Sequence, residues 1–240
     1  MKVIKANNIT VPTPTDGWLK KLRTSLAAFA PSGDPVTTLL NEDYGGGHCV
    51  YSVGLKKIEG LKKLDEINTP LYWRFLAQGA DTATGAACLA THESSKLPAK
   101  VMAALNGPEV ADILKSAENL NHLKEVRGKP NNHYELRVLR MPALSVEAFW
   151  LKSLTGKPED DLIVPYGLVV DGSDSIKLPG GKTQLKKDHA YPVAEFLEMM
   201  QGAARHRRDA DDKAPQARYN RSLMATGRPF PHGTSRAAGH

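Results

Sequence analysis

The sequence predicts an α+β fold, with a mixed or mostly antiparallel sheet packed against three to four helices. Strand-like and helix-like segments alternate only irregularly, and no βαβ unit with a glycine-rich fingerprint is present, so a regular parallel sheet is not expected. With 41% hydrophobic and 24% charged residues, the composition is typical of a globular protein. We expect one domain over residues 1–202. A flexible, arginine-rich tail is expected over 203–240, where apolar residues are scarce.

A short strand and an amphipathic helix begin the predicted domain. Residues 3–11 have strand character, interrupted at the Asn7-Asn8 pair. Thr15 or Asp16 can cap the helix that follows, and its apolar residues recur at helical spacing: Trp18, Leu22, Leu26 and Phe29. A second strand is predicted over 48–53.

The middle of the chain predicts a hairpin flanked by helical segments. Residues 55–67 fit either one helix or a turn followed by a helix, because Gly60 weakens a continuous helix. Segments 70–79 and 85–93 can both be strands and would pair as a hairpin. Residues 106–126 predict a helix with Pro108 in its first turn.

The stretch "YELRVLRMPALSVEAFWLK", residues 134–152, is the most heavily patterned part of the chain. Residues 134–141 alternate like a half-buried strand, which must end or bend at Pro142. Residues 144–152 fit either a helix capped by Ser145 or a strand. The strand is favoured because "DLIVP", residues 161–165, would pair with it. We expect the apolar side chains between 134 and 165 to be buried rather than to contact a ligand.

The last predicted elements are a loop over 171–181 and a helix over 191–200 with Pro192 in its first turn. The net charge of +6 is concentrated beyond that helix. Residues 203–240 contain eight Lys+Arg and three Asp+Glu, which leaves 24 basic and 23 acidic residues in the domain. The domain is therefore close to neutral and has no general basic field for nucleic acid.

The sequence also carries expectations about compartment. It has no run of about 18 apolar residues, which a membrane-spanning helix would need. We see no secretory signal, and with only two cysteines we expect no disulfide framework. Cytoplasmic residence is the expectation.

A glycine-rich segment, "GGGHCV", is the first candidate site. Gly45, Gly46 and Gly47 would let the backbone approach a ligand closely, and His48 and Cys49 follow directly. Adjacent strand residues point to opposite faces, so His48 cannot easily activate Cys49. A base would have to come from elsewhere, for instance from one of the other histidines: His92, His122 or His133.

The segment "YWRFL" supplies a second candidate. On a strand, Tyr72 and Arg74 share one face, whereas Trp73 and Phe75 share the other. We expect Trp73 and Phe75 to lie in the core. Tyr72 and Arg74 remain candidate ligand contacts at the surface, because Tyr and Arg are enriched in binding hot spots.

Several catalytic and cofactor motifs fail at a required position. "PGGKT", residues 179–183, lacks the first glycine of a phosphate-binding loop, since Ile176 stands there. "THESSK" has Lys96 where a zinc-protease helix needs its second histidine. The histidines are scattered and no Cys-x-x-Cys pair is present. We therefore expect no metal site and no cofactor.

These observations lead to three functional hypotheses. The favoured one is a non-enzymatic module that acts through contacts with a protein partner or through self-association, with the tail as an accessory segment. The second is a hydrolase or transferase with a pocket near residues 45–49. The third, less favoured because "DADD" interrupts the basic run, is weak nucleic-acid binding by the tail through residues such as Arg205, Arg207 and Arg208.

Overall fold

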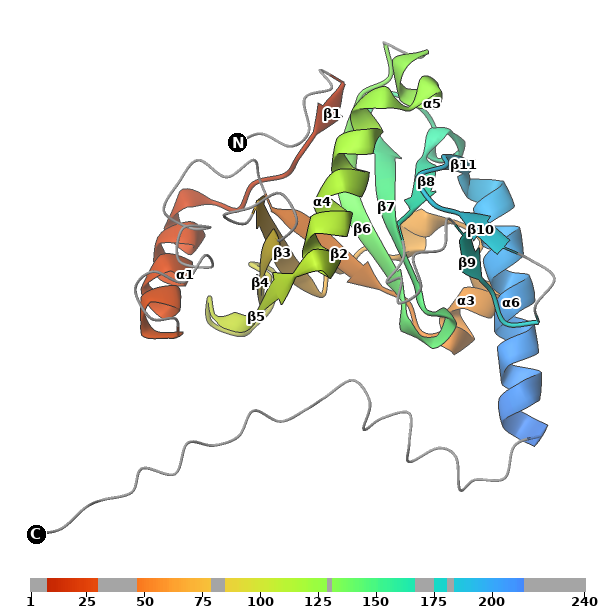
Figure 1. The fold of residues 1–240 in the computed structure, drawn as a ribbon, viewed down its shortest axis with the longest axis horizontal. Helices are drawn as coiled ribbons and strands as arrows, with labels where there is room; N and C mark the ends of the chain where they lie inside the picture. The colour runs from red at the N-terminus through yellow and green to blue at the C-terminus, as the bar shows by residue number, and fades with distance from the viewer. Residues whose placement is uncertain are drawn as a thin grey trace, which may run out of the picture.

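The computed structural model describes residues 8–29, 47–78, 85–128, 131–166, 175–180 and 184–213. These residues form an α+β fold built on one large mixed sheet, as predicted (Figure 1). The strands of this sheet are β1 (Ile9–Thr10), β2 (His48–Ser52), β3 (Tyr72–Gln78), β4 (Gly85–Thr91), β5 (Val101–Gly107), β6 (Tyr134–Met141), β7 (Val146–Ser153), β8 (Leu162–Pro165) and β11 (Tyr191–Pro192), while β9 (Ser175–Lys177) and β10 (Gln184–Lys186) form a separate hairpin.

The described helices vary widely in length. Those of the α type are α1 (Asp16–Phe29), α3 (Leu55–Gly60), α4 (Pro108–Asn119), the single turn α5 (Lys124–Arg127) and α6 (Val193–Lys213). Four short 3-10 turns are η1 (Leu64–Glu66), η2 (Leu120–His122), η3 (Pro142–Leu144) and η4 (Pro158–Asp160). Residues 55–67 thus form a helix, α3, and a separate turn, η1, because the helix ends at Gly60.

Two antiparallel groups of strands make up the large sheet, in the spatial order β11-β8-β7-β6-β2-β3-β4-β5. The parallel pair β2–β6 joins the two groups. β1 also runs parallel to β6, opposite Tyr134 and Glu135, so β1 and β2 follow one another along the same edge of β6. Both predicted hairpins are confirmed: β3 pairs with β4, and "DLIVP" pairs as β8 with β7.

The ambiguous segment 144–152 is a strand, the alternative that the sequence favoured. Pro142 ends β6, and Ser145 takes a left-handed conformation, with φ of 55°, that turns the chain back. β7 then pairs with β6 along its whole length and with β8 on its other edge. The six residues from Val146 to Leu151 are all buried, which explains why their sequence lacks the alternation of a half-buried strand.

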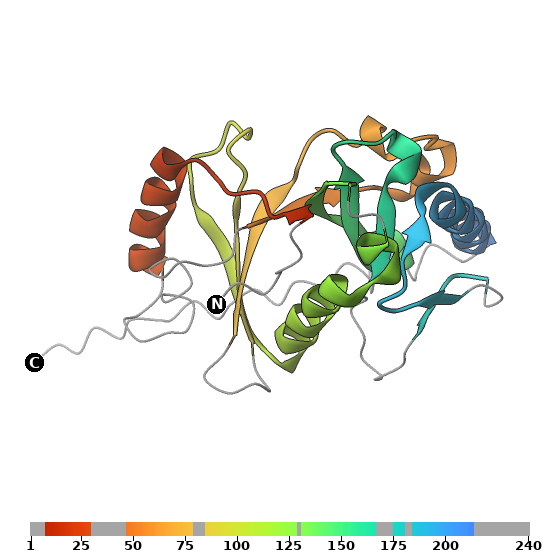
Figure 2. The same ribbon diagram turned by 90° about the horizontal axis from the view of Figure 1, so that it is seen from above.

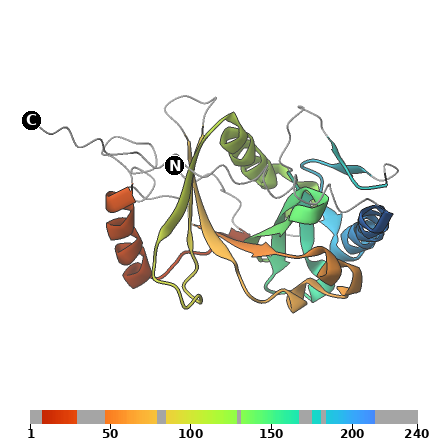
Figure 3. The same cartoon turned by 90° about the horizontal axis from the view of Figure 1, so that it is seen from below.

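Each face of the sheet has its own hydrophobic core. α4 and α5 cover one face, here called the α4 face, and α1, α3 and α6 cover the opposite one, the α6 face (Figure 2, Figure 3). Phe149 lies in the core of the α4 face and Trp150 in that of the α6 face, and both are fully buried. The Trp150 indole donates a hydrogen bond of 2.7 Å to the buried Asp161 carboxylate. These side chains are therefore core residues, as expected.

Several elements differ from the sequence predictions. β5 was not predicted, because "VMAALNG" is dominated by small residues and has no clear alternation. The predicted loop 171–181 contains β9, which pairs with β10. The predicted helix 106–126 is divided into α4, η2 and α5. Pro192 also lies just before α6 rather than in its first turn.

The last helix extends beyond the predicted domain boundary. α6 continues through Gly202 to Lys213, and Ala203 and Ala204 are buried in the core of the α6 face. The helix thus continues past residue 202, and Ala203 and Ala204 pack in the core although the sequence placed them in the tail. Residues 214–240 lie outside the described residues, as do 1–7. Within the described part, no helix has the length and apolar character required to cross a membrane.

An aromatic cluster fixes α1 against the α6 face. The Trp73 and Phe75 rings stack with centroids 6.1 Å apart, and Trp18 of α1 lies 6.4 Å from Trp73 and 6.5 Å from Phe75. Gly47 lies under these rings. A Cβ atom there would come within 2.6 Å of the Trp73 ring and 2.9 Å of the Phe75 ring. The absence of a side chain at Gly47 is therefore required by aromatic packing.

We expect Gly47→Ala to lower the free energy of unfolding by about 1–3 kcal/mol, because the added methyl group overlaps two buried rings. Gly54→Ala is the matched control, since a Cβ at Gly54 meets nothing within 4 Å. The control should change stability by less than about 1 kcal/mol. Urea unfolding followed by tryptophan fluorescence measures both, and equal effects of the two substitutions would contradict this packing role.

Candidate functional site

Only one of the three glycines in the glycine-rich segment lies within the described residues. Gly45 and Gly46 lie outside the described residues. Gly47 is buried, and its N–H donates a hydrogen bond of 3.1 Å to the carbonyl of Pro12. Gly47 is needed for the close packing under Trp73 described above. Its position therefore does not support the prediction that this segment binds a ligand.

His48 and Cys49 point to opposite faces of β2. The His48 ring packs edge-on against Phe149 on the α4 face, with centroids 5.9 Å apart, whereas Cys49 belongs to the core of the α6 face. Burial, and then the charge of Arg74, lowers the pKa of His48 to about 3. His48 is therefore neutral at physiological pH and is not positioned to activate Cys49.

Cys49 does have a histidine within reach, His92, whose Nε2 lies 3.6 Å from Sγ. However, His92 Nδ1 accepts a hydrogen bond of 3.1 Å from the Ser94 N–H. The neutral ring must then carry its proton on Nε2, which points at the sulfur and cannot accept the thiol proton. Burial also raises the pKa of the Cys49 thiol to about 12 and lowers that of His92. This pair is poorly suited to nucleophilic catalysis.

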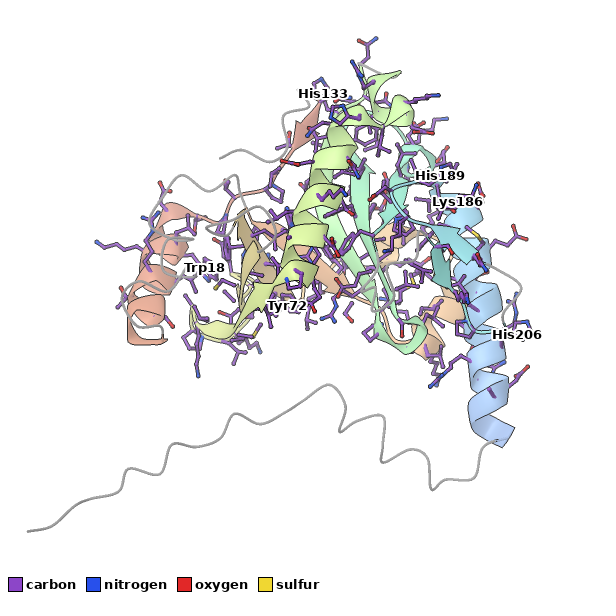
Figure 4. The ribbon with its side chains drawn as sticks, viewed as in Figure 1. Trp18, Tyr72, His133, Lys186, His189 and His206 are labelled. Carbon is purple, nitrogen blue, oxygen red and sulfur yellow. The ribbon has the colours of Figure 1, made fainter. Side chains whose placement is uncertain are left out.

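The other two histidines considered as bases, His122 and His133, are exposed. Figure 4 places His133 at one end of the sheet, far from Tyr72 near the N-terminal end of α4. Among the described residues, no group of three or more His, Cys, Asp or Glu side chains could hold a metal ion.

Tyr72 and Arg74 share the α4 face, and Trp73 and Phe75 share the other, as the sequence predicts. Tyr72 and Arg74 are not at the surface, however, because they are only 7% and 5% exposed. They belong to a buried polar cluster, here called the arginine site, whose members come from four strands and the residue after β8: His48, Tyr72, Arg74, Arg140, Glu147 and Tyr166.

Glu147 of β7 is the centre of the arginine site. Its Oε2 lies 3.3 Å from Arg74 Nη1 and accepts a hydrogen bond of 2.8 Å from the Tyr166 hydroxyl. Its Oε1 pairs with Arg140 Nε. Arg140 Nη1 in turn donates a hydrogen bond of 2.6 Å to the Tyr72 hydroxyl. One carboxylate thus holds two guanidinium groups from β3 and β6.

Arg74 leaves one edge of its guanidinium unpaired. Its Nη1 faces Glu147, whereas Nε and Nη2 are buried without a hydrogen-bond partner among the described residues. These two N–H groups lie side by side in the guanidinium plane and form a fork that matches two oxygens of a carboxylate or phosphate. His48 lies opposite Arg74 in the β2–β3 pair, and its Nδ1 is also buried without a partner.

The charges of the arginine site do not balance. Burial alone would lower the pKa of Arg74, but Tyr166 and Glu147 raise it overall, so the guanidinium stays charged. Arg140 is also charged, and His48 is neutral. Two positive charges therefore face the single carboxylate of Glu147, and the site carries a net charge of +1.

Sequence reasoning missed Arg140, Glu147 and Tyr166 as site residues. Arg140 lies on β6 near two other charged residues, Glu135 and Arg137, but those two pair with each other at 2.6 Å, and Arg140 pairs with Glu147. The available signal was Glu147 itself. A carboxylate inside the buried run "VEAFWL" requires a positive partner on a neighbouring strand.

The three arginines considered for nucleic acid lie on the last turns of α6 and are exposed. Arg208 forms an ion pair with Glu59 of α3, so it helps to pack α3 against α6. The rest of the basic tail, 214–240, lies outside the described residues.

Of the motif at 179–183, Pro179 and Gly180 are described, and Gly180 packs against His206.

Comparison of the chain with protein-family models, with curated proteins and with solved structures found no match.

The thiols should be chemically inert in the folded protein. A pKa of about 12 for Cys49 leaves about one thiol in ten thousand ionised at pH 8. We expect iodoacetamide to label Cys49 and Cys88 at least about 100-fold more slowly in buffer than in concentrated urea, as measured by mass spectrometry. Rapid labelling of Cys49 in the native protein would instead revive the hydrolase or transferase hypothesis.

His48 should make the fold sensitive to acid. Its pKa in the folded state lies below that of an unfolded histidine, so the unfolded chain binds the proton first and stability falls as the pH drops from about 6.5 toward 3. Between pH 7 and pH 5, urea unfolding should show the wild type losing about 2 kcal/mol more than His48→Gln. The exposed His133→Gln is the control and should behave like the wild type. The same loss in all three proteins would contradict the buried, neutral state of His48.

Proposed function

We propose that this protein is a non-enzymatic binding module that recognises an anionic group of its ligand or partner through the arginine site. The observation that carries the proposal is the unpaired, buried Nε and Nη2 edge of Arg74. Buried donors without acceptors cost free energy in the unliganded protein, about 1–3 kcal/mol for each group. An anion that accepts both hydrogen bonds removes that cost on binding.

A purely structural role for Arg74 leaves the charge of the cluster unexplained. Arg140 already neutralises Glu147 and also binds Tyr72. A second buried guanidinium adds a charge that has no counterion among the site residues, and such a charge is expensive to bury. An incoming anion supplies the counterion.

The chemistry of Cys49 and His92 argues against the alternative hypothesis, catalysis at Cys49. The thiol is protonated, and the nearest histidine nitrogen already carries a proton. The exposed fractions of the two arginine side chains indicate where an anion could enter the site. The Arg140 side chain is 30% exposed and that of Arg74 is 6% exposed, so we expect the anion to enter past Arg140.

Arg74→Lys tests the proposal, because lysine keeps the positive charge but lacks the planar fork. We expect at least one anion from a panel of acetate, sulfate and phosphate to bind the wild type saturably at constant ionic strength. Arg74→Lys should weaken that binding at least about tenfold. Binding is measured by calorimetry and by the shift of the Arg74 Nε–H resonance in the wild type.

Arg137→Lys is the matched control, since Arg137 lies on the α6 face over Tyr51 and Trp150. It should bind like the wild type, and circular dichroism must show that both variants are folded. The proposal fails if no anion saturates the wild type, or if Arg74→Lys binds as tightly as Arg137→Lys.

A further inference from the structure

The number of free donors in the arginine site limits the shape of the anion. On the α4 face, the buried side-chain nitrogens without a partner among the described residues include Nε and Nη2 of Arg74 and Nδ1 of His48. The Arg74 edge offers two parallel N–H groups in one plane, which suit the two coplanar oxygens of a carboxylate. His48 can donate a third hydrogen bond in the tautomer that carries its proton on Nδ1.

A tetrahedral oxyanion fits this donor set less well. Phosphate and sulfate have four oxygens, and the planar edge of Arg74 engages two of them. His48 Nδ1 can serve one more, so the fourth oxygen has no donor among the unpaired nitrogens of Arg74 and His48. Unpaired buried acceptors lower affinity. The Tyr166 ring lies under the Arg74 guanidinium, 5.4 Å from its central carbon, but its hydroxyl already donates a hydrogen bond to Glu147.

The net charge of the site also favours a carboxylate, which is a monoanion, over a dianion such as sulfate. The net charge of +1 is neutralised by a monoanion. A dianion such as sulfate would leave a net negative charge beside the Glu147 carboxylate, which lies 3.3 Å from the same guanidinium. Like charges at such distances repel strongly in a buried site. His48 cannot offset this repulsion, because its ring stays neutral.

Resting on the anion site proposed above, we infer that the group bound by the arginine site is a carboxylate, held by the Arg74 Nε and Nη2 edge and by His48 Nδ1. The ligand is therefore a molecule that presents a terminal carboxylate, either a small organic acid or the end of a peptide. The body of that molecule would extend past the partly exposed Arg140 toward solvent.

The experiment compares four probes on the folded, full-length chain at constant ionic strength: acetate, its neutral isostere acetamide, sulfate and inorganic phosphate. Acetate should bind at least about tenfold more tightly than either oxyanion, and acetamide should not bind. The readout is the Arg74 Nε–H resonance and the ring resonances of His48, which report on the site in the wild type without a substitution. N-acetylglycine, which mimics a peptide terminus, separates the two sources: tighter binding than acetate indicates a peptide end, and equal or weaker binding a small acid.

The outcomes distinguish this inference from the proposed function. If sulfate or phosphate binds as tightly as acetate and Arg74→Lys abolishes that binding, the anion site stands and the carboxylate assignment is wrong. If no probe saturates, or if acetate binds Arg74→Lys as well as the wild type, both are wrong. His48→Phe, which removes the third donor but keeps an aromatic ring beside Phe149, should weaken acetate binding about three- to tenfold. Unchanged acetate binding in His48→Phe would also overturn the assignment, because the carboxylate would then not use His48 Nδ1.

Discussion

The carboxylate of Glu147 determines how the α4 face of the sheet is assembled. Its two oxygens hold Arg74 of β3 and Arg140 of β6, together with the Tyr166 hydroxyl after β8. One side chain thus connects the two antiparallel groups of strands, in addition to the parallel β2–β6 pairing. Breaking a buried pair of this kind costs about 3–5 kcal/mol, because an uncompensated charge remains inside the protein. The register of β7 is fixed accordingly, since a shift by one residue would turn Glu147 to the opposite face.

The sequence predicted those elements whose pattern is local. The alternation of Tyr134, Leu136 and Val138 in β6 and the helical spacing in α4 place these apolar residues in the core of the α4 face, as predicted, and Leu22 of α1 lies in the core of the α6 face. β5 was missed because its small side chains carry little pattern, and the end of α6 was placed too early because Gly202 lies within a helix that continues to Lys213. A glycine does not end a helix when packing on either side of it is favourable.

The candidate site was predictable only within one strand. The alternation of "YWRFL" placed Tyr72 and Arg74 on one face, but nothing in a single sequence gives the register that sets Arg140 opposite Glu147. The heavily apolar stretch from 134 to 165 proved to be core, and the buried carboxylate of Glu147 within it was the informative residue. In a strand buried on both faces, a charged residue indicates a partner on a neighbouring strand.

The arrangement of β1 and β2 in succession along β6 affects how the chain can fold during synthesis. Both strands are made early, yet their shared partner begins at Tyr134. Until the ribosome has produced β6, the edge of β2 that pairs with β6 has no hydrogen-bonding partner strand. Only the group of strands from β2 to β5 can form before then. Contacts between distant parts of a chain slow folding and prolong the exposure of open edges. The nascent protein would therefore depend on the prompt synthesis of its second half to form the β2–β6 pair at the centre of the sheet.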